Sequence, residues 1–210
     1  MVTAGPTYEP IDPVRFIGNH SSGKMGIAIA KELYNRGADV TLILGPSQLD
    51  FSANGISVIK VKTADEMYKA SNDIFGKTDI AVMAAAVADY SPVTTENEKI
   101  RKTEEKFTLE LTKTKDILKS LGEKKKPGQV VVGFALETTN EKQNALDKLL
   151  KKNADLIVLN SLMDEGAGFG YDTNKITIFE KGGQEFSFPR KSKMDVAKDI
   201  VDTIIRLYYV

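Results

Sequence analysis

Short apolar runs alternate along this chain with segments in which apolar residues recur at helical spacing. The apolar runs, bounded by glycine or polar turns, predict strands at Val40–Leu44, Ile56–Val61, Asp79–Val87, Val130–Leu136 and Asp155–Leu159. The helical spacing predicts helices at Ala64–Phe75, at Asn140–Lys152 and, behind a Ser192-x-x-Asp195 capping box, at Ser192–Val210. Strands that alternate with helices indicate an α/β chain with a Rossmann-like, mostly parallel sheet and helices on both faces.

The pattern changes near the C-terminus. Lys175–Lys181 and Gln184–Phe188 flank Gly182-Gly183, as in an antiparallel hairpin with a type I′ turn. We expect this hairpin extension, near residues 175–189, to form a sheet edge or a surface completed by another subunit, because isolated hairpins are marginal. The closing helix, with Met194 among its apolar positions, is interpreted as structural packing.

Composition excludes several classes of function. The 210 residues are 41% hydrophobic, enough for the core of a single domain spanning residues 1–210. Lys and Arg total 29, as do Asp and Glu, so no overall field would hold a nucleic acid or an anionic membrane. The absence of cysteine and the single histidine, His20, exclude disulfides, thiolate sites and multi-histidine metal centres.

The two ends of the chain bear on its location and origin. No apolar run approaches the roughly 18 residues of a membrane span, and no signal peptide is visible, so a cytoplasmic location is expected. The start, Met1-Val2-Thr3-Ala4-Gly5-Pro6, enters at the end of a strand. We therefore expect the chain to be a piece excised from a longer one.

A glycine-rich loop before the first helical segment is typical of phosphate binding. Gly18-x4-Gly23-Lys24 almost matches the P-loop, but Met25 replaces the Ser or Thr that coordinates magnesium. The dinucleotide fingerprint G-x-G-x-x-G does not fit either. An ordinary turn before a surface helix is the alternative, but the polar run Asn19-His20-Ser21-Ser22 exceeds what a helix cap needs. The sequence therefore favours a phosphate loop of another kind.

Small and acidic residues follow two of the expected strands. Ligands of open α/β sheets bind at the carboxyl ends of strands, where this chain carries Gly5-Pro6-Thr7 and then Ala84–Asp89. Small residues allow close approach of a ligand, and Asp89 offers a carboxylate to sugar hydroxyls or base nitrogens. Taken alone, the alanines are better explained as packing under a helix.

Cations and a further glycine loop complete the candidates. Glu96–Lys106 has the mixed charge of a solvated loop, yet its position after a candidate ligand strand suits a mobile flap, at about residues 94–106, that brings Lys99 onto phosphates. Lys113 and Lys115 also follow this strand, and Lys148, Lys151 and Lys152 lie on the helix Asn140–Lys152, where Lys148 and Lys152 share a face. The loop Gly166–Asp172 is given a structural role. Without a Ser-His-Asp arrangement or a metal cluster, catalysis would rest on positioning and charge stabilisation.

Several long segments, in order along nearly the whole chain, resemble bacterial phosphopantothenate-cysteine ligase, the ligase domain of the bifunctional coenzyme A biosynthesis protein. They are Val2–Arg15, Asn19-His20-Ser21-Ser22-Gly23-Lys24-Met25-Gly26, Ala85–Tyr90, Lys99-Ile100-Arg101-Lys102 and Val132–Thr138. The resemblance implies that 4′-phosphopantothenate attacks CTP, that pyrophosphate leaves an acyl-cytidylate, and that L-cysteine then displaces CMP. It implies Mg²⁺ carried by the triphosphate, with no side-chain metal site and no flavin in this domain.

The resemblance also assigns residues. Asn19 and Lys99 are implied to be catalytic, Asn19 at the acyl group and Lys99 from the flap. The implied nucleotide contacts are Ser21, Ser22, Gly23, Ala85, Asp89, Lys99, Lys115, Asp116, Ile117, Leu118, Phe134, Lys148 and Lys152, of which the segment at Lys115 is variable in the family. The implied substrate contacts are Gly5, Pro6, Thr7, Asn19 and Ala86.

The family further implies partners and leaves alternatives. It forms homodimers with the site near the interface, which would give the 175–189 hairpin a role in pairing. It is often fused to a phosphopantothenoylcysteine decarboxylase, which nothing in this chain resembles. An ATP-driven ligase and a non-catalytic, NAD-type nucleotide-binding domain remain open, because the alternating β/α order serves each equally well.

Overall fold

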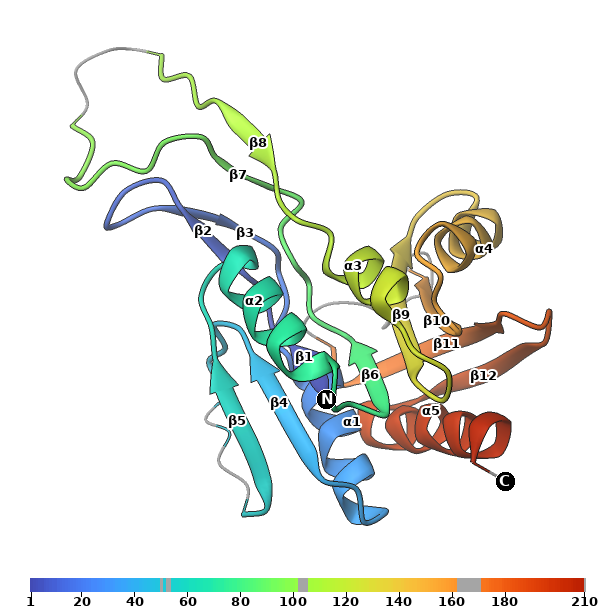
Figure 1. The fold of residues 1–210 in the computed structure, drawn as a ribbon. Helices are drawn as coiled ribbons and strands as arrows, with labels where there is room; N and C mark the ends of the chain where they lie inside the picture. Colours follow the sequence, from blue (N-terminus) through green and yellow to red (C-terminus); the bar gives the residue numbers. More distant parts are fainter. Residues whose placement is uncertain (50, 52–53, 102–105, 162–170, 210) are drawn as a thin grey trace.

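An eight-stranded sheet runs through the molecule, and Figure 1 shows helices on both of its sides. The computed structural model describes the chain except for residues 50, 52–53, 102–105, 162–170 and 210. In order across the sheet, the strands are β12 (Glu185–Ser192), β11 (Thr173–Glu180), β10 (Leu156–Ser161), β9 (Val130–Glu137), β6 (Ile80–Met83), β1 (Val2–Ala4), β4 (Val40–Leu44) and β5 (Ile56–Lys60). The strands from β5 to β10 pair in parallel, and β11 and β12 are antiparallel. The predicted fold class is confirmed.

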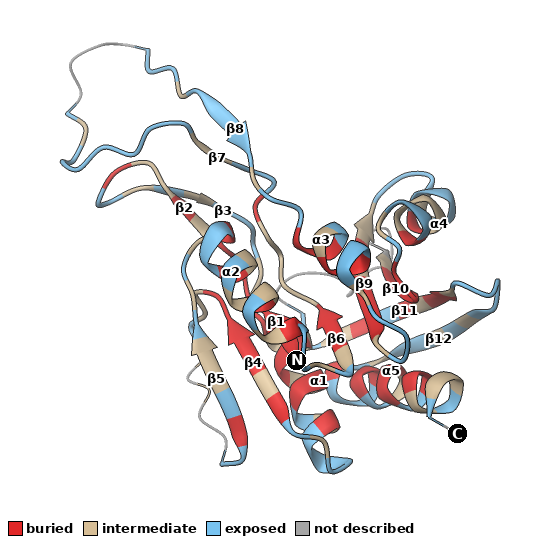
Figure 2. Ribbon diagram, in the orientation of Figure 1, coloured by how far each residue is buried: buried red, intermediate tan, exposed pale blue. Residues whose placement is uncertain are grey.

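Alternate residues of the central strands build two cores, one on each face of the sheet. Val130 and Val132 pack on the face covered by α1 (Lys24–Asn35) and α5 (Lys193–Tyr208). Val131, between them, packs on the opposite face, under α2 (Ala64–Phe75), α3 (Ile117–Lys124) and α4 (Glu141–Lys151). Burial on both faces explains the nearly continuous apolar runs of these strands, and Figure 2 shows it concentrated in the sheet and the inner sides of the helices.

The chain reverses its direction of winding at β1. It proceeds from β1 to β4 and β5 on one side, and then returns to β6, β9 and β10 on the other. Ligands of doubly wound sheets bind at this switch point, outside the carboxyl ends of the strands. Helix α1 begins there and packs closely on β1 because residue 26 is glycine. A Cβ on Gly26 would lie 2.5 Å from the Cβ of Ala4.

Two short antiparallel hairpins project beyond the sheet and form the arm seen in Figure 1. In the arm, β2 (Tyr8–Pro10) pairs with β3 (Phe16–Gly18), β7 (Tyr90–Pro92) pairs with β8 (Leu111–Lys113), and β2 lies against β7. The Asp12 carboxylate accepts the Ile100 N–H at 3.2 Å, and the Arg15 guanidinium donates to the Ile100 carbonyl at 3.3 Å. The first hairpin therefore holds the backbone next to Lys99.

Several elements differ from the sequence predictions. The strand predicted at Asp79–Val87 ends at Met83, since residues 84–87 leave the sheet as a loop. Helix α3 was not predicted, although Asp116 caps it by accepting the Lys119 N–H at 2.8 Å. The four short strands of the arm were also missed, because their sequences lack a regular alternation. Residues 102–105 of the expected flap and 162–170, which include most of the third glycine loop, lie outside the described residues.

The C-terminal hairpin is completed within the chain. Its strand β11 pairs with β10, so the sheet-edge alternative is correct and no second subunit is needed to complete it. The type I′ assignment is wrong, because of the two turn glycines only Gly183 has a positive φ, 97°. Gly183 N–H donates to Glu180 O, and Glu180 N–H to Gln184 O, as in a three-residue loop with a bulge. Met194, expected among the packed residues of α5, is 66% exposed.

Candidate functional site

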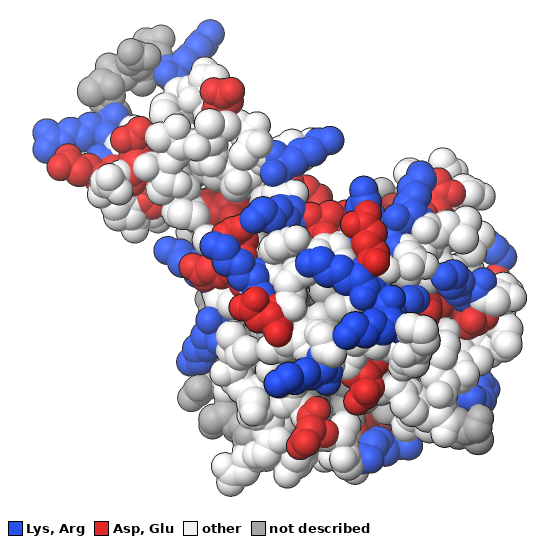
Figure 3. All heavy atoms as spheres, in the orientation of Figure 1, with Lys and Arg blue, Asp and Glu red and all other residues white. Residues whose placement is uncertain are grey.

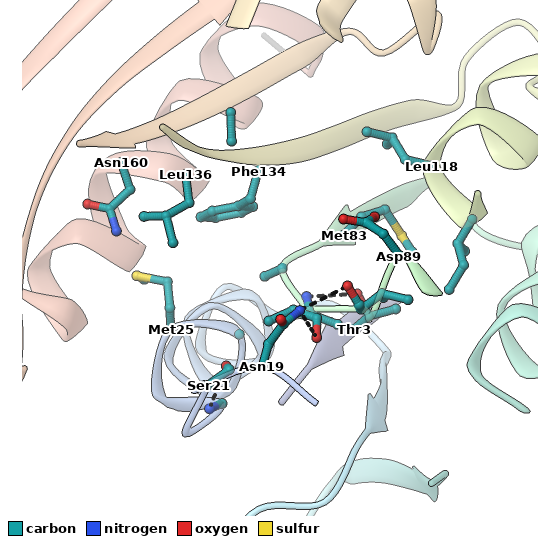
Figure 4. A pocket seen from close by; sticks show the side chains of 18 of the residues that line it. Thr3, Asn19, Ser21, Met25, Met83, Asp89, Leu118, Phe134, Leu136 and Asn160 are labelled. Carbon is teal, nitrogen blue, oxygen red and sulfur yellow. Dashed lines mark hydrogen bonds between the residues drawn. The ribbon is translucent and has the colours of Figure 1, made fainter. Parts of the chain in front are cut away.

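A pocket of about 800 Å³ lies at the switch point. The loop before α1, the loop after β6 and the start of α3 form its walls, together with residues of β9, α4, β10, β11 and α5. Figure 4 shows Asn19 and Thr3 on one wall with Phe134 and Leu136 facing them, Asn160 and Met25 at one end, and Leu118 toward the other. Charges of both signs are interspersed over the surface in Figure 3, so any preference for anions arises from local groups.

The loop before α1 presents backbone donors to this pocket. The N-cap residue of α1, Gly23, has φ 81° and makes no side-chain capping bond, so none of the preceding polar side chains caps the helix. The Asn19 amide instead donates to Ala86 O at 3.1 Å and Val87 O at 3.0 Å, and the Ser21 Oγ accepts the Gly23 N–H at 3.3 Å. An N-terminus without a side-chain cap, opening into a pocket, suits an anionic group.

One end of the pocket carries Lys148 of α4 and Lys152, the residue that follows the last turn of this helix. Lys148 Nζ donates to Phe134 O at 2.7 Å, and Lys152 Nζ lies 2.5 Å from Asp116 Oδ2. Burial lowers the pKa of Lys148, although the carboxylates of Glu137 and Asp116 oppose this shift. Burial would raise the pKa of Asp116, but its hydrogen bonds, that from Lys152 the strongest, hold it below the usual value. This end therefore combines a half-buried cation with an ion pair.

The opposite end holds two lysines that the predicted site does not include. Lys24 Nζ lies 2.5 Å from Asp172 Oδ1, and the backbone N–H of Lys193 donates to Asp172 O at 2.9 Å. Lys193 is buried, and this burial, reinforced by the charge of Lys24, lowers its pKa. Asn174 Nδ2 lies 3.8 Å from Met25 Sδ at the same end.

Most predicted site residues line this one pocket. They are Asn19, Ser21, Ser22, Gly23, Ala85, Ala86, Asp89, Lys115, Asp116, Ile117, Leu118, Phe134, Lys148 and Lys152. Lys115 is engaged elsewhere in this state, since its ammonium lies 2.8 Å from Asp65 Oδ1 and over the ring of Tyr68. Asn160 also lines the pocket but was missed, although its place at the end of β10 follows the same rule that led to Asp89.

Gly5, Pro6 and Thr7, which were expected to contact substrate, do not line the pocket. They are buried beneath the loop after β6, where Gly5 O accepts the Ala86 N–H at 2.9 Å and Thr7 Oγ1 accepts the Ala88 N–H at 3.0 Å. In the structure, these residues support the loop after β6 through these hydrogen bonds. Lys99 is exposed on the arm and also lies outside the pocket lining, so its closing as a flap stays a prediction.

Metal-ligating clusters, long apolar helices and buried polar atoms concern the described residues only. Among them, no group of three His, Cys, Asp or Glu side chains is placed to hold a metal ion. No helix in the described ranges is long and apolar enough to cross a membrane. The buried Asn160 Oδ1 has no hydrogen-bond partner among the described residues, so it remains open to a donor from a ligand.

Comparisons with known proteins converge on one family. The model of the DNA/pantothenate metabolism flavoprotein C-terminal domain matches residues 1–208. The chain is 51% identical over 209 residues to a protein named cysteine/cysteine sulfinic acid decarboxylase, from an unknown prokaryotic organism, covering 100% of this chain and 58% of that protein. It is 47% identical over 207 residues to the coenzyme A biosynthesis bifunctional protein CoaBC of Bacillus subtilis (strain 168), covering 99% of this chain and 51% of that one.

A solved structure agrees with the sequence matches. The crystal structure of the C-terminal domain of the coenzyme A biosynthesis bifunctional protein CoaBC superposes with a TM-score of 0.83 at 39% identity, covering 98% of this chain and 92% of that one. The chain thus spans a little over half of the curated relatives described above and nearly all of the solved C-terminal domain.

Proposed function

The chain belongs to the DNA/pantothenate metabolism flavoprotein C-terminal domain family, and from this premise we propose that it joins 4′-phosphopantothenate to L-cysteine at the expense of CTP. The observation that carries the proposal is the pocket at the switch point, where Asn19, the N-terminus of α1 and Lys148 line one space. The name of the Bacillus relative, a coenzyme A biosynthesis protein, supports the pathway.

The proposed reaction has two steps. A carboxylate oxygen of phosphopantothenate attacks the α-phosphorus of CTP, and the bond to the bridging oxygen of the β-phosphate breaks, so pyrophosphate leaves with that electron pair. The cysteine amine then attacks the acyl carbon of the acyl-cytidylate and loses a proton; the bond between that carbon and the bridging oxygen breaks, and CMP leaves with this oxygen and the electron pair, while the carbonyl oxygen stays in the new amide. Neither step requires a covalent enzyme nucleophile, which agrees with a site built for positioning and charge stabilisation.

Each side chain has a role that matches its chemistry. Asn19 is proposed to place its amide at the acyl oxygen, where negative charge develops. The loop Ser21–Gly23 would hold phosphates with backbone and hydroxyl donors. Asp89 and the α4 lysines would contact the nucleoside end, and Phe134 offers a ring face for the base. Lys99 would close over the intermediate when the flap moves.

Magnesium is proposed to enter with the triphosphate. The ion would be held mainly by phosphate oxygens, as hard cations often are. It would supply charge neutralisation to the leaving pyrophosphate. A cytoplasmic setting, where CTP and cysteine are available, is part of the same proposal.

We extend the proposal to the assembly. Large apolar side chains are exposed on the described part of the arm, at Val14, Phe16, Tyr90, Val93, Phe107 and Leu111. Figure 3 shows uncharged surface on the arm between its charged side chains. Exposed apolar surface of this kind is typical of an interface, and we propose that the arms of two copies pair as a homodimer. The proposed further partner, fused or associated, is a phosphopantothenoylcysteine decarboxylase, in line with the bifunctional Bacillus relative.

The first experiment measures pyrophosphate release from CTP and, separately, from ATP, with phosphopantothenate and Mg²⁺, with and without cysteine. We expect release that depends on phosphopantothenate, prefers CTP, and continues through repeated turnovers only with cysteine. A preference for ATP would overturn the nucleotide assignment. Binding of nucleotide without any release would favour a non-catalytic binding domain.

A further inference from the structure

The lysines that line the pocket differ in what their ammonium groups contact. Most of them interact with another group of the chain: Lys24 with Asp172, Lys115 with Asp65, Lys148 with Phe134 O, Lys152 with Asp116, and Lys193 with the charge of Asp172. Lys113 also lines the pocket, and among the described residues its side chain has no hydrogen bond or ion pair. It can therefore bind an anionic ligand without first giving up a partner.

Lys113 has a cross-strand neighbour with a similar side-chain environment. It is the last residue of β8, at the root of the arm in Figure 1, and it lies opposite Tyr90, the first residue of β7. Directly opposed residues of an antiparallel pair share one face, with Cβ atoms about 5 Å apart. Tyr90 also lines the pocket, is 45% exposed, and has no hydrogen-bond partner for its hydroxyl in the described part of the chain. The root of the arm thus presents an ammonium and a phenol hydroxyl, both of them donors, to one space.

An exposed lysine at a strand end is ordinarily a solvated surface residue. The backbone beside Lys113, however, is held firmly at the pocket by the next residue, Thr114. Its N–H donates to Asp89 O at 3.0 Å and its hydroxyl donates to Ala88 O at 2.7 Å. Asp89 belongs to the same wall of the pocket, yet no ion pair joins its carboxylate to Lys113 within the described ranges. The side chain of Lys113 is therefore unpaired on a backbone that is fixed.

The loop after β6 leads from the place of the acyl group to this pair. The Asn19 amide donates to Val87 O at 3.0 Å, and Tyr90 follows Val87 by three residues. Three extended residues span at most about 11 Å, which the atoms between the carboxyl group and the phosphate ester of phosphopantothenate can bridge. In the proposed reaction Asn19 serves the acyl end and the α1 N-terminus serves the triphosphate. The phosphate ester still needs donors of its own.

We propose that Lys113 and Tyr90 bind the phosphate ester of phosphopantothenate, and that they make the protein prefer this substrate to unphosphorylated pantothenate. The inference rests on the proposed function. The ammonium pairs with one phosphate oxygen, and the phenol hydroxyl donates to another, as charge-assisted hydrogen bonds. Holding the far end of the substrate here, and the acyl end at Asn19, restricts the carboxylate to the position from which it attacks.

The test uses 4′-phosphopantothenate and pantothenate as separate probes in calorimetric titrations, with CTP present and Mg²⁺ withheld so that no reaction follows. Lys113→Met should weaken phosphopantothenate binding by about tenfold or more, the loss expected for one charge-assisted hydrogen bond, and should leave pantothenate binding within about twofold. Lys113→Arg keeps the charge and should retain most of the affinity. Tyr90→Phe removes only the hydroxyl, keeps the ring on the arm, and should weaken phosphopantothenate binding severalfold.

A separate titration with CTP reports that the pocket has folded, and its affinity should stay within about twofold in each variant. Lys119→Met is the matched control, because it removes the same charge from an exposed lysine of α3 outside the pocket lining. It should leave every titration unchanged. The subsite is overturned if the wild-type protein does not distinguish phosphopantothenate from pantothenate, if Lys113→Met retains the affinity for phosphopantothenate, or if it weakens pantothenate or CTP equally.

Failure of the subsite and failure of the ligase are distinguishable. Selective binding of phosphopantothenate that depends on Lys113, in a protein without phosphopantothenate-dependent pyrophosphate release, would leave the subsite and remove the reaction. Pyrophosphate release whose KM for phosphopantothenate is the same in Lys113→Met and wild type would leave the reaction and remove the subsite.

Discussion

The carboxamide of Asn19 holds the carbonyls of Ala86 and Val87 at 3.1 and 3.0 Å. It thereby links the loop before α1 to the loop after β6, which are the two loops between which the acyl group would lie. Both N–H groups of the amide are used in these bonds, so we expect one of the two to be exchanged for the acyl carbonyl oxygen when negative charge develops on it.

Asn19→Ala is expected to lower turnover by about 10²- to 10³-fold, the usual effect of removing one oxyanion donor. CTP affinity should change little, because the α1 N-terminus and the α4 lysines remain. Pyrophosphate release and CTP titration would be measured together. His20→Ala, in the same loop but outside the pocket lining, is the control. Full product formation by Asn19→Ala would remove the catalytic assignment.

Lys148 makes the site sensitive to alkaline pH. Because burial lowers its pKa below that of a free lysine, it loses its charge earlier as the pH rises. CTP affinity should therefore start to weaken at a lower pH than the ordinary lysine pKa of about 10.4 would allow. Lys148→Arg, which stays charged, should shift this loss to higher pH. Lys151→Arg, on the exposed side of α4, should not; an identical profile for all three proteins would contradict the role of Lys148.

The sequence alone identifies a site residue when that residue belongs to a local motif. Asn19 lies in a polar run too long for a cap, and Lys148 and Lys152 share a helical face. Lys193 follows a capping serine and looks like any exposed lysine in a first turn. It becomes part of the pocket only through the pairing of β11 with β12, a contact that spacing along the chain does not encode.

The position of α1 depends on its residue Gly26, which packs directly against β1. Gly26→Ala would place a Cβ 2.5 Å from Ala4 Cβ and 2.9 Å from Thr3 O, so the helix must shift. We expect a loss of about 1–3 kcal/mol in the free energy of unfolding, seen as a lower Tm, together with weaker nucleotide binding. Gly76→Ala is the matched control. It has no atom within 4 Å and a helical φ of −59°, so it should be neutral or slightly stabilising.

Asp12, on the first hairpin of the arm, holds the backbone of Ile100, next to Lys99 of the proposed flap. Its side chain is fully buried. Burial would raise its pKa, but backbone N–H groups, including that of Ile100, and the Arg15 charge hold the pKa below the usual value. The carboxylate therefore stays ionised until the pH falls well into the acid range, and its stabilising bonds are lost only there.

Asp12→Asn keeps the size of the side chain but replaces one carboxylate oxygen by an amide N–H. This N–H would face the N–H of Ile100 instead of accepting it, which should release Ile100. We expect faster proteolysis next to Lys99 and turnover reduced by about ten- to hundredfold, since a small misplacement of a positioned group has effects of this size. Asp73→Asn, an exposed carboxylate of α2, should change neither. Unchanged cleavage would show that Asp12 does not hold the flap.

Elements with a clear period were predicted within a few residues, and those without one were missed. The predicted bounds of β4 and α2 match the structure because apolar runs and caps mark both ends. Helix α3 was missed, although Asp116 followed by Ile117, Leu118 and Leu121 is a capping and apolar pattern. The arm strands are three residues each, and their pairing depends on contacts between distant segments.

The whole molecule is a doubly wound sheet: from β1 the chain leads to one edge at β5, and it then starts again beside β1 at β6 and leads to the other edge at β12. The alternation of strands and helices predicts this class, and the class predicts the place of the pocket. The order of the strands, and the placing of lysines at both ends of the pocket, are properties of the assembled sheet. They depend on whether each crossover connection places the next strand on one side of β1 or on the other. The local sequence does not determine this choice.

Association through the arm is the prediction that belongs to this scale. Leu111 and Val93 are 42% and 52% exposed on the part of the arm that carries the proposed flap. A carboxylate buried there without a partner would cost several kcal/mol, so Leu111→Asp and Val93→Asp should shift sedimentation from dimer to monomer at equal concentration. Leu150→Asp, at an apolar residue 71% exposed on α4, is the control and should leave the dimer intact.

A monomeric wild-type protein at all concentrations would overturn the dimer. A dimer that survives both arm variants would place the interface elsewhere. Turnover that falls with the loss of the dimer would show that the flap needs the partner arm to close.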